Sequence, residues 1–257
     1  MTKMLVNPQN LKGQSFPSQD RVSAVYLSEV LSDLDEGADF LSRLSPDELD
    51  KVRAAGSACR FEKGAGIFFQ GDRHSGIWLI ESGSVRTFYA GPSGREITLA
   101  FWTPGHFIGG PEIFGGGTHM WSADTQEDVT LLYITGARIR QLVDTMPSFA
   151  VCLINGLVAK GKCYSALVQM LGTRSVTERL AQLLIILGDT HGKSVGNQLI
   201  IEKTVTHENL AAIVGSTRQW VTITLDKFQK KGLITAKRGR MVIENYDLLR
   251  AEVGGTF

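Results

Sequence analysis

The chain has 257 residues, of which 43% are hydrophobic and 21% charged, and its net charge is +1. Such a composition is typical of a soluble protein with about two domains of roughly 100–200 residues each. No run approaches the ~18 consecutive apolar residues of a membrane span, and the N-terminus lacks an apolar signal core. Cys59, Cys152 and Cys163 are too scattered for a disulfide framework. We therefore expect a cytoplasmic protein without a membrane partner.

The first half of the chain divides into a polar tail and a glycine-rich segment. Residues 1–22 predict a flexible tail. A helix is expected to begin at Ser45–Pro46, because serine caps helices and proline suits the first turn. From 61 to 134, short alternating runs lie between glycines, and residues 60–117 hold 13 of the 28 glycines. This pattern predicts an all-β sandwich or roll, with a hairpin turn at "AGPSGRE".

A long helix is expected after Pro147. Its apolar side chains recur at the alternating spacing of a coiled-coil seam, which favours a dimer helix over one packed only on its own domain. The predicted seam is Ala150, Ile154, Leu157, Gly161, Tyr164, Val168 and Leu171. Cys152 and Cys163 lie about three turns apart on this helix, so we interpret them as inert core thiols rather than a redox pair.

The C-terminal part begins with a helix in "SVTERLAQLLIILGD", a loop in "HGKSVGNQ" and a strand in "LIIEKTV". Thr206 can then cap a helix over "HENLAAIV", and Gly215 permits a tight turn. Ser216 or Thr217 can cap a second helix, expected over 216–231. These features together predict a helix-turn-helix.

The second helix has a buried stripe and a wing behind it. Val221, Leu225 and Phe228 recur at i, i+4 and i+7, and Gly232 ends the helix. The segment "LITAKRGRMVIEN" adds two strands around a basic turn, which is a wing. The prediction is therefore a winged helix-turn-helix.

Basic residues gather in this part of the chain. From Thr173 to Phe257 there are 12 Lys and Arg against 8 Asp and Glu, a balance typical of a phosphate-binding surface. The first residues of the second helix in such a motif meet base edges in the major groove. The residues expected to contact DNA are Ser216, Thr217, Arg218, Gln219, Trp220, Thr222, Ile223, Lys237, Arg238 and Arg240. Trp220 would either pack at the edge of the motif or lie against the DNA backbone.

Three segments in this order resemble the Crp/Fnr family of bacterial transcription regulators, over residues from about 40 to 250. They are "GDRHSGIWLIESGSVRTFYAGPSGREITLAFWTPGHFIGG", "TRSVTERLAQLLIIL" and "LAAIVGSTRQWVTITLDKFQKKGLI". The resemblance implies an α+β fold: a double-stranded, jelly-roll-like β-roll sensor, a long dimerisation helix and a C-terminal winged helix-turn-helix. The expected division is a tail at 1–22, the sensor with flanking helices at 23–140, the dimerisation helix at 141–172 and the DNA-binding domain at 173–257.

The same resemblance implies a non-enzymatic homodimer that binds a palindromic DNA operator under the control of a small-molecule effector. If it is an activator, RNA polymerase is a further partner. Gln219 and Ile223 stand where the family often has Glu and Arg. Loss of a cytosine acceptor and of a guanine donor predicts an operator half-site with more A·T character.

The sensor departs from the cyclic-nucleotide-binding members. Where these hold the ribose with Gly-Glu and the phosphate with Arg-Ser/Thr, this chain has "GGPEIF" and "THMWSAD". A phosphate without its arginine loses a charge-assisted contact, so we expect an uncharged or weakly acidic organic effector other than cAMP. The candidate pocket residues, which would serve equally as core, are Trp102, Phe107, Gly109, Gly110, Glu112, Ile113, His119, Met120, Trp121, Leu157 and Tyr164.

No metal site or cofactor is expected. Iron–sulfur members carry clustered N-terminal cysteines, whereas no cysteine precedes Cys59 here. An alternative is a haem-based sensor with His74, His106 or His119 as the ligand. A different class, the cupin-type metalloenzyme, would need a His-x-His pair, which the chain does not contain.

Overall fold

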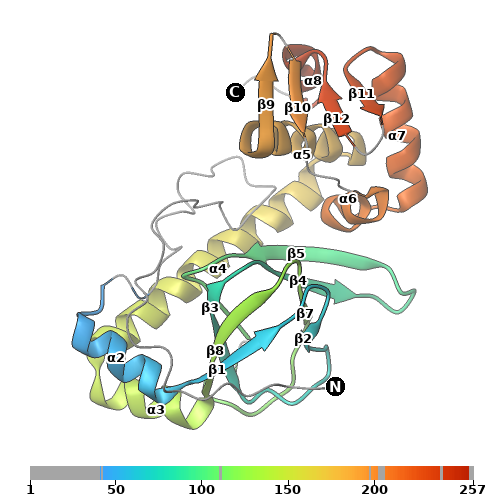
Figure 1. The fold of residues 1–257 in the computed structure, drawn as a ribbon. Coiled ribbons are helices and arrows are strands. Elements are labelled where there is room, and N and C mark those ends of the chain that lie inside the picture. The colour runs from blue at the N-terminus through green and yellow to red at the C-terminus, as the bar shows by residue number, and fades with distance from the viewer. Residues whose placement is uncertain are drawn as a thin grey trace. The chain divides into compact units, whose positions relative to one another are not determined.

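The computed structural model describes residues 41, 43–109, 112–196, 198–201, 206–237 and 240–254 (Figure 1). The predicted tail at 1–22 and the part of the predicted sensor domain at 23–40 lie outside these ranges. The described residues form two compact units: the first lies within 41–90 and 99–164, and the second within 91–98 and 165–254. One boundary between them falls within a single helix, between Tyr164 and Ser165. Each unit is described by itself.

Residues 57–135 form two four-stranded antiparallel sheets, with strand orders β1-β8-β3-β6 and β2-β7-β4-β5. The strands are β1 Ser57–Phe61, β2 Gly66–Phe68, β3 Gly76–Ser82, β4 Val85–Ala90, β5 Glu96–Trp102, β6 Phe107–Ile108, β7 Ser122–Thr125 and β8 Val129–Thr135. In the predicted hairpin turn the Gly91 amide donates to the Arg95 carbonyl, 2.9 Å away. The prediction of a β-roll is confirmed.

Alternation along the strands divides the core of the first unit in two. On β3, Trp78 and Ile80 belong to a cluster shared by both sheets, while Ile77 and Leu79 belong to a second cluster that includes helical residues. Successive side chains of a strand point to opposite faces, so one strand contributes to both. The first cluster lies between the two sheets, and we call it the inner core. The second lies between one sheet and the helices, and we call it the outer core.

Three helices accompany this roll: α2 Pro46–Ala55, α3 Gly136–Thr145 and α4 Pro147–Thr173. The Ser45 hydroxyl accepts from the Glu48 amide while the Glu48 carboxylate accepts from the Ser45 amide, a complete capping box at the predicted helix start. The long helix begins at Pro147, so the expected segment 141–172 contains the end of α3 and most of α4.

Helix α4 is long and apolar enough to cross a membrane by length and composition alone. Its buried side chains, however, belong to the cores of the roll. Phe149, Cys152 and Leu153 lie in the outer core, and Cys163 lies in the inner core. The helix is therefore a structural part of the first unit along one face.

The second unit is a winged helix-turn-helix, as predicted. Its elements are α5 Val176–His191, β9 Gly192–Val195, β10 Gln198–Ile201, α6 His207–Val214, α7 Arg218–Lys230, β11 Ile234–Lys237, β12 Arg240–Ile243 and α8 Tyr246–Ala251. The four strands form an antiparallel sheet in the order β11-β12-β10-β9. The prediction of a loop at "HGKSVGNQ" is wrong for its first half. Residues 192–195 form a strand that pairs with 198–201 in a hairpin.

Candidate DNA-binding surface and sensor site

The turn between α6 and α7 is built by three local features. The Thr206 hydroxyl accepts from the Asn209 amide and caps α6. Gly215 ends α6 with φ +62°, in the left-handed region that favours glycine. The Thr217 hydroxyl then accepts from the Trp220 amide at 3.3 Å and caps α7. Of the two predicted caps Thr217 is used, and Ser216 is buried rather than part of the exposed face.

Helix α7 buries one stripe and exposes the other. Val221, Leu225 and Phe228 are buried as predicted, and Thr224 joins them. The exposed side chains near its N-terminus are Arg218, Gln219, Trp220, Thr222 and Ile223. All five belong to the residues predicted to contact DNA, and Arg218, Gln219, Thr222 and Ile223 are those predicted to read bases.

Two of these side chains have constraints that the sequence did not reveal. The Thr222 hydroxyl donates to the Arg218 carbonyl and lies 2.9 Å from His207 Nδ1, so its methyl group is what remains for an outside partner. Trp220 is 53% exposed, although it is the largest apolar side chain of the helix. It does not pack into the core of the motif, which favours an external contact.

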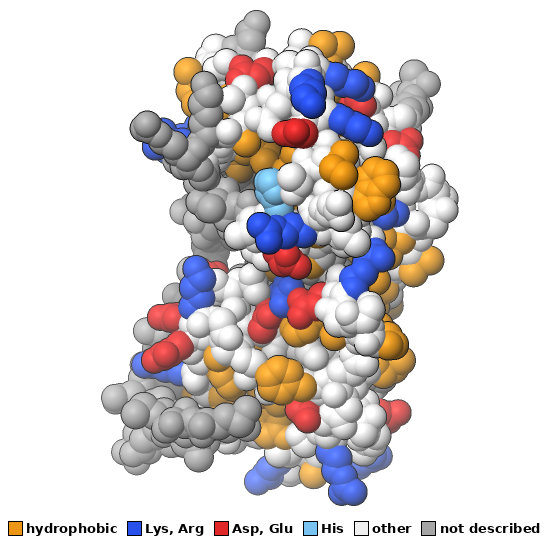
Figure 2. All heavy atoms as spheres, turned by 90° about the vertical axis from the view of Figure 1, so that its right-hand side faces the viewer, with side chains coloured by type: hydrophobic (Ala, Val, Ile, Leu, Met, Phe, Trp, Pro, Cys, Tyr) orange, Lys and Arg blue, Asp and Glu red, His pale blue; other side chains and the backbone are white. Residues whose placement is uncertain are grey.

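Positive charge surrounds this face. Figure 2 shows basic side chains gathered in this domain beside exposed hydrophobic groups. Arg218, Lys227 and Lys230 are exposed on α7, and Arg240 is exposed at the start of β12. Lys231 is paired with Glu252 at 2.5 Å, which reduces its availability. Of the other predicted wing contacts, Arg238 and the side chain of Lys237 lie outside the described parts.

In the first unit, aromatic rings from β5, from α4 and from the residue just before β7 meet. Tyr164 packs edge-on against Trp102, with ring centroids 6.3 Å apart, and against Trp121, 5.8 Å away. The Trp102 indole donates to the Thr87 hydroxyl at 3.0 Å, which fixes its ring in the core. Three residues predicted to line the effector pocket are thus brought together, and we call Trp102, Trp121 and Tyr164 the aromatic cluster.

A buried lysine lies against this cluster. Lys160 of α4 is 9% exposed, and its Nζ lies 3.7 Å from the centroid of the Trp102 ring and 4.7 Å from that of Phe107. Sequence reasoning missed it. The signal was its spacing: Lys160 shares a helical face with Leu153, Gly156 and Cys163, all of them buried.

The lysine and its neighbours have shifted acidities. Burial lowers the pKa of Lys160 to about 7 and raises that of Cys163 to about 12, so the thiol stays protonated at neutral pH. Burial, with the nearby Lys160 charge, lowers the pKa of His106 to about 4. The Tyr164 phenol is also shifted upward by burial. A protonated thiol agrees with inert cysteines on α4.

The other predicted pocket residues are dispersed. His119 stacks on Phe68 with ring centroids 3.9 Å apart, and it lies beside His74 rather than in the aromatic cluster. Ile113 and Phe107 belong to the outer core. The remaining described ones are Gly109, buried at a positive φ, and the exposed Glu112, Met120 and Leu157. Gly110 lies outside the described residues.

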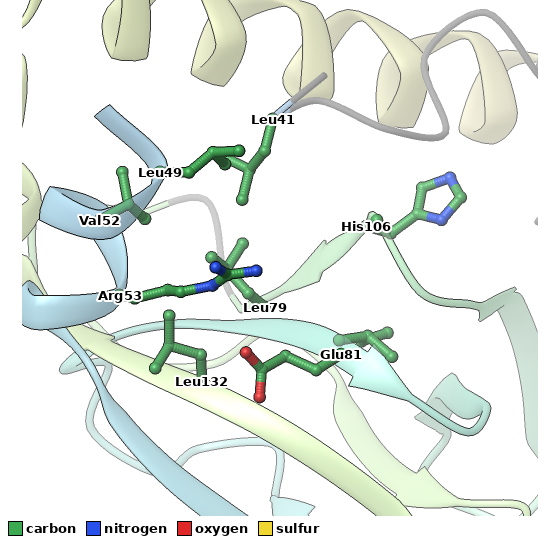
Figure 3. A pocket seen from close by; sticks show the side chains of 10 residues that line it. Leu41, Leu49, Val52, Arg53, Leu79, Glu81, His106 and Leu132 are labelled. Atoms are coloured by element: carbon green, nitrogen blue, oxygen red, sulfur yellow. The ribbon is translucent and has the colours of Figure 1, made fainter. Parts of the chain in front are cut away.

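A recess lies between α2 and the outer face of the roll (Figure 3). Its cavity volume is about 20 Å³, room for about one water molecule, and its apolar lining comes from Leu41, Leu49, Val52, Leu79, Ile80 and Leu132. Figure 3 shows the Arg53 guanidinium and the Glu81 carboxylate facing each other across it. Burial raises the pKa of Glu81, and the Arg53 charge opposes the shift. His106 lines its edge and also contacts Trp102, so the recess adjoins the aromatic cluster.

The predicted seam of α4 is split by the fold. Four of its residues are exposed: Ile154, Leu157, Gly161 and Val168. Tyr164 instead packs against Trp102 and Trp121 in the aromatic cluster. Ala150 and Leu171 are half-buried. Val151 and Val158 extend the exposed apolar face, which the predicted seam did not include.

Comparison with known proteins covers both units. The cyclic nucleotide-binding domain model matches residues 58–146, and the Crp-like helix-turn-helix domain model matches residues 178–252. Together they span more than half of the chain. The chain belongs to the Crp/Fnr family of transcription regulators.

Other Crp/Fnr proteins match it along most of its length. It is 26% identical over 214 residues to the cyclic AMP receptor protein of Thermus thermophilus, covering 83% of this chain and 96% of that one. It is also 26% identical over 188 residues to the global nitrogen regulator of Synechococcus elongatus, covering 72% and 85%. The c-di-GMP-responsive global regulator CLP of Xanthomonas campestris has the same fold, with a TM-score of 0.71, 22% identity and coverage of 78% and 100%. As a Crp/Fnr regulator, the protein binds DNA and is not an enzyme.

Proposed function

We propose that the protein is an effector-responsive homodimer that binds a two-fold symmetric operator through α7. The observation that carries the reading role is the exposed face of Arg218, Gln219 and Ile223 at the N-terminus of that helix. Arg suits guanine, Gln suits adenine, and the Ile and Thr222 methyl groups suit the thymine methyl. The basic residues of the wing, Lys237, Arg238 and Arg240, would contact phosphates.

The homodimer rests on the exposed face of α4. Val151, Ile154, Val158, Gly161 and Val168 follow the alternating three- and four-residue spacing of a coiled coil, with one polar position between the last two. Ile154 is 58% exposed and Val168 is 69% exposed, and contiguous exposed apolar side chains of this kind are typical of a protein–protein interface. A second copy of α4 would bury this stripe.

The effector is proposed to be a small organic molecule other than cAMP, bound beside α4 in the first unit. Its supports are the aromatic cluster and the residues at 118–121, where Thr118, His119, Met120 and Trp121 offer no guanidinium to a cyclic phosphate. Such a regulator would act in the cytoplasm and, if it activates transcription, would contact RNA polymerase.

The test is in vitro selection of DNA bound by the full-length protein from a random pool. We expect an inverted repeat with half-site centres one helical turn, about 34–36 Å, or a multiple of it apart. Enrichment of a single half-site, or of no sequence at all, would contradict the symmetric operator. The isolated operator then serves as the reference site for every variant below.

A further inference from the structure

We propose that Lys160 is the anion-recognising residue of the sensor, and that the effector is an organic acid with an aromatic body. This inference rests on the proposed function, since it names the ligand class of the same site. Of the two effector classes expected from the sequence, uncharged and weakly acidic, the proposal selects the acidic one.

The first observation is a buried lysine side chain with which no carboxylate of the described residues pairs. Nζ of Lys160 lies against the faces of Trp102 and Phe107. Aromatic faces attract a cation but compensate only part of the loss of its hydration. A carboxylate brought to Nζ would form the charge-assisted hydrogen bond that the rings cannot supply.

The second observation is the character of the surroundings. The aromatic cluster joins rings from β5, α4 and the residue before β7, with Tyr164 edge-on to both tryptophans. The surroundings of Nζ are thus aromatic, and an aromatic ligand body could make the same offset or edge-to-face contacts with these rings. One ammonium balances one negative charge, so a monoanion fits better than a dianion, whose second charge would stay buried and unpaired.

The groups that face Lys160 make its titration readable. Burial lowers the pKa of Lys160 to about 7, whereas that of His106 is lowered to about 4 and that of Cys163 is raised to about 12. Tyr164 is shifted upward as well. Between pH 7 and pH 9, Lys160 is therefore the group of this set that changes charge. A bound carboxylate would raise its pKa, so binding at pH 8 should take up a proton and weaken as the pH rises.

The experiment is calorimetric titration of the full-length protein with three acids and their uncharged amides. The pairs are benzoate and benzamide, 2-naphthoate and 2-naphthamide, and indole-3-acetate and indole-3-acetamide. We expect at least one acid to bind at least tenfold more tightly than its amide. Lys160→Met should abolish that preference and Lys160→Arg should retain it. Lys162→Met, a lysine exposed on the same helix, should match the wild type.

The wild type alone supplies a second measurement, which holds if a Lys160 variant fails to fold. At pH 8 the binding enthalpy of the preferred acid should differ between Tris and phosphate buffers, as proton uptake requires. Absence of binding by all three acids, equal binding of an amide, or an unchanged preference in Lys160→Met would overturn the proposal. Tight binding of cAMP by the wild type would instead contradict the proposed non-cAMP effector, and the same variants would still report on Lys160.

Discussion

At the start of α7, neighbouring residues have different tasks. Thr217 caps the helix and Val221 anchors it from behind, while Arg218 and Gln219 between them face solvent. Successive side chains of a helix point about 100° apart, so residues that anchor the helix and residues that face solvent alternate within one turn. The capping residue is therefore structural even though it lies beside the residues proposed to read bases.

Replacing Gln219 by Ala tests direct readout. We expect the variant to lose discrimination at one operator position by about 1–3 kcal/mol, because the paired contacts of the amide to adenine disappear. The measurement is binding of the selected operator and its single-base substitutions to the wild type and the variant. Arg240→Ala is the matched control: it should weaken all sites alike and reduce the salt slope by about 1. A uniform loss in Gln219→Ala would assign that residue to the backbone instead.

Buried imidazoles predict a loss of stability in mild acid. Burial, together with the charge of His74, lowers the pKa of His119 to about 4, and that of His106 is lowered to about 4 as well. Below pH 6.5 these two imidazoles bind protons in the unfolded chain but stay neutral in the folded protein until the pH approaches 4. The free energy of unfolding should therefore fall from pH 6.5 to 4, by at most ~1.4 kcal/mol per pH unit for each imidazole.

The variant His119→Phe isolates one of these protons. Phenylalanine preserves the stacking on Phe68, so the fold should remain while the slope between pH 6.5 and 4 becomes shallower. Urea unfolding at several pH values measures it. Equal slopes in the two proteins would show that His119 is protonated in the folded state.

At the scale of the element, α4 has two apolar faces with different fates. One face carries Phe149, Leu153 and Cys163 into the core of the roll. The other leaves Ile154, Leu157 and Val168 exposed. A helix with apolar side chains on both faces is typical of an element between a core and a partner.

Placing a charge on the exposed face should break the dimer. Ile154→Glu would bury a carboxylate in the coiled-coil seam without a partner, which is unfavourable. We expect the variant to elute and scatter as a monomer where the wild type is a dimer, in light scattering coupled to size exclusion. The matched control is Val195→Glu on β9, since Val195 is an apolar residue that is 55% exposed and is not part of α4. If the wild type is a monomer, the seam hypothesis is wrong.

At the scale of the whole molecule, one helix belongs to both units. The division between Tyr164 and Ser165 means that sensor residues and the start of the second unit follow one another along α4. Lys160 and Tyr164 are thus one turn from the second unit in the sequence. An equilibrium between two arrangements of the dimer, biased by what binds beside them, would link the two functions.

Linkage makes that coupling measurable from either side. If the preferred acid changes operator affinity by a given factor, saturating operator must change the affinity for the acid by the same factor, typically 5–150-fold. Both affinities can be measured on the full-length protein by fluorescence titration. Lys160→Met should keep its operator affinity and lose its response to the acid. Two unequal factors would mean that the acid binds elsewhere or that the DNA measurement reports another process.

The helix-turn-helix was predictable from the sequence because its determinants are local. A cap at Thr206, a left-handed glycine at 215, a stripe of Val221, Leu225 and Phe228 and a stop at Gly232 lie within 27 consecutive residues and act through hydrogen bonds and periodicity. The glycine-spaced strands of the roll were predictable for the same reason, since turns and alternation are short-range signals.

Tertiary structure alone decided which of two apolar stripes on α4 is covered, because the helical period reveals a stripe but not its partner. It turned Tyr164 inward, left Val151 and Val158 outside, and placed Lys160 on the rings of Trp102 and Phe107. It also paired 192–195 with 198–201. The residues proposed to read DNA follow from the order of amino acids, whereas the lysine proposed to sense the effector follows from packing between segments distant in the chain.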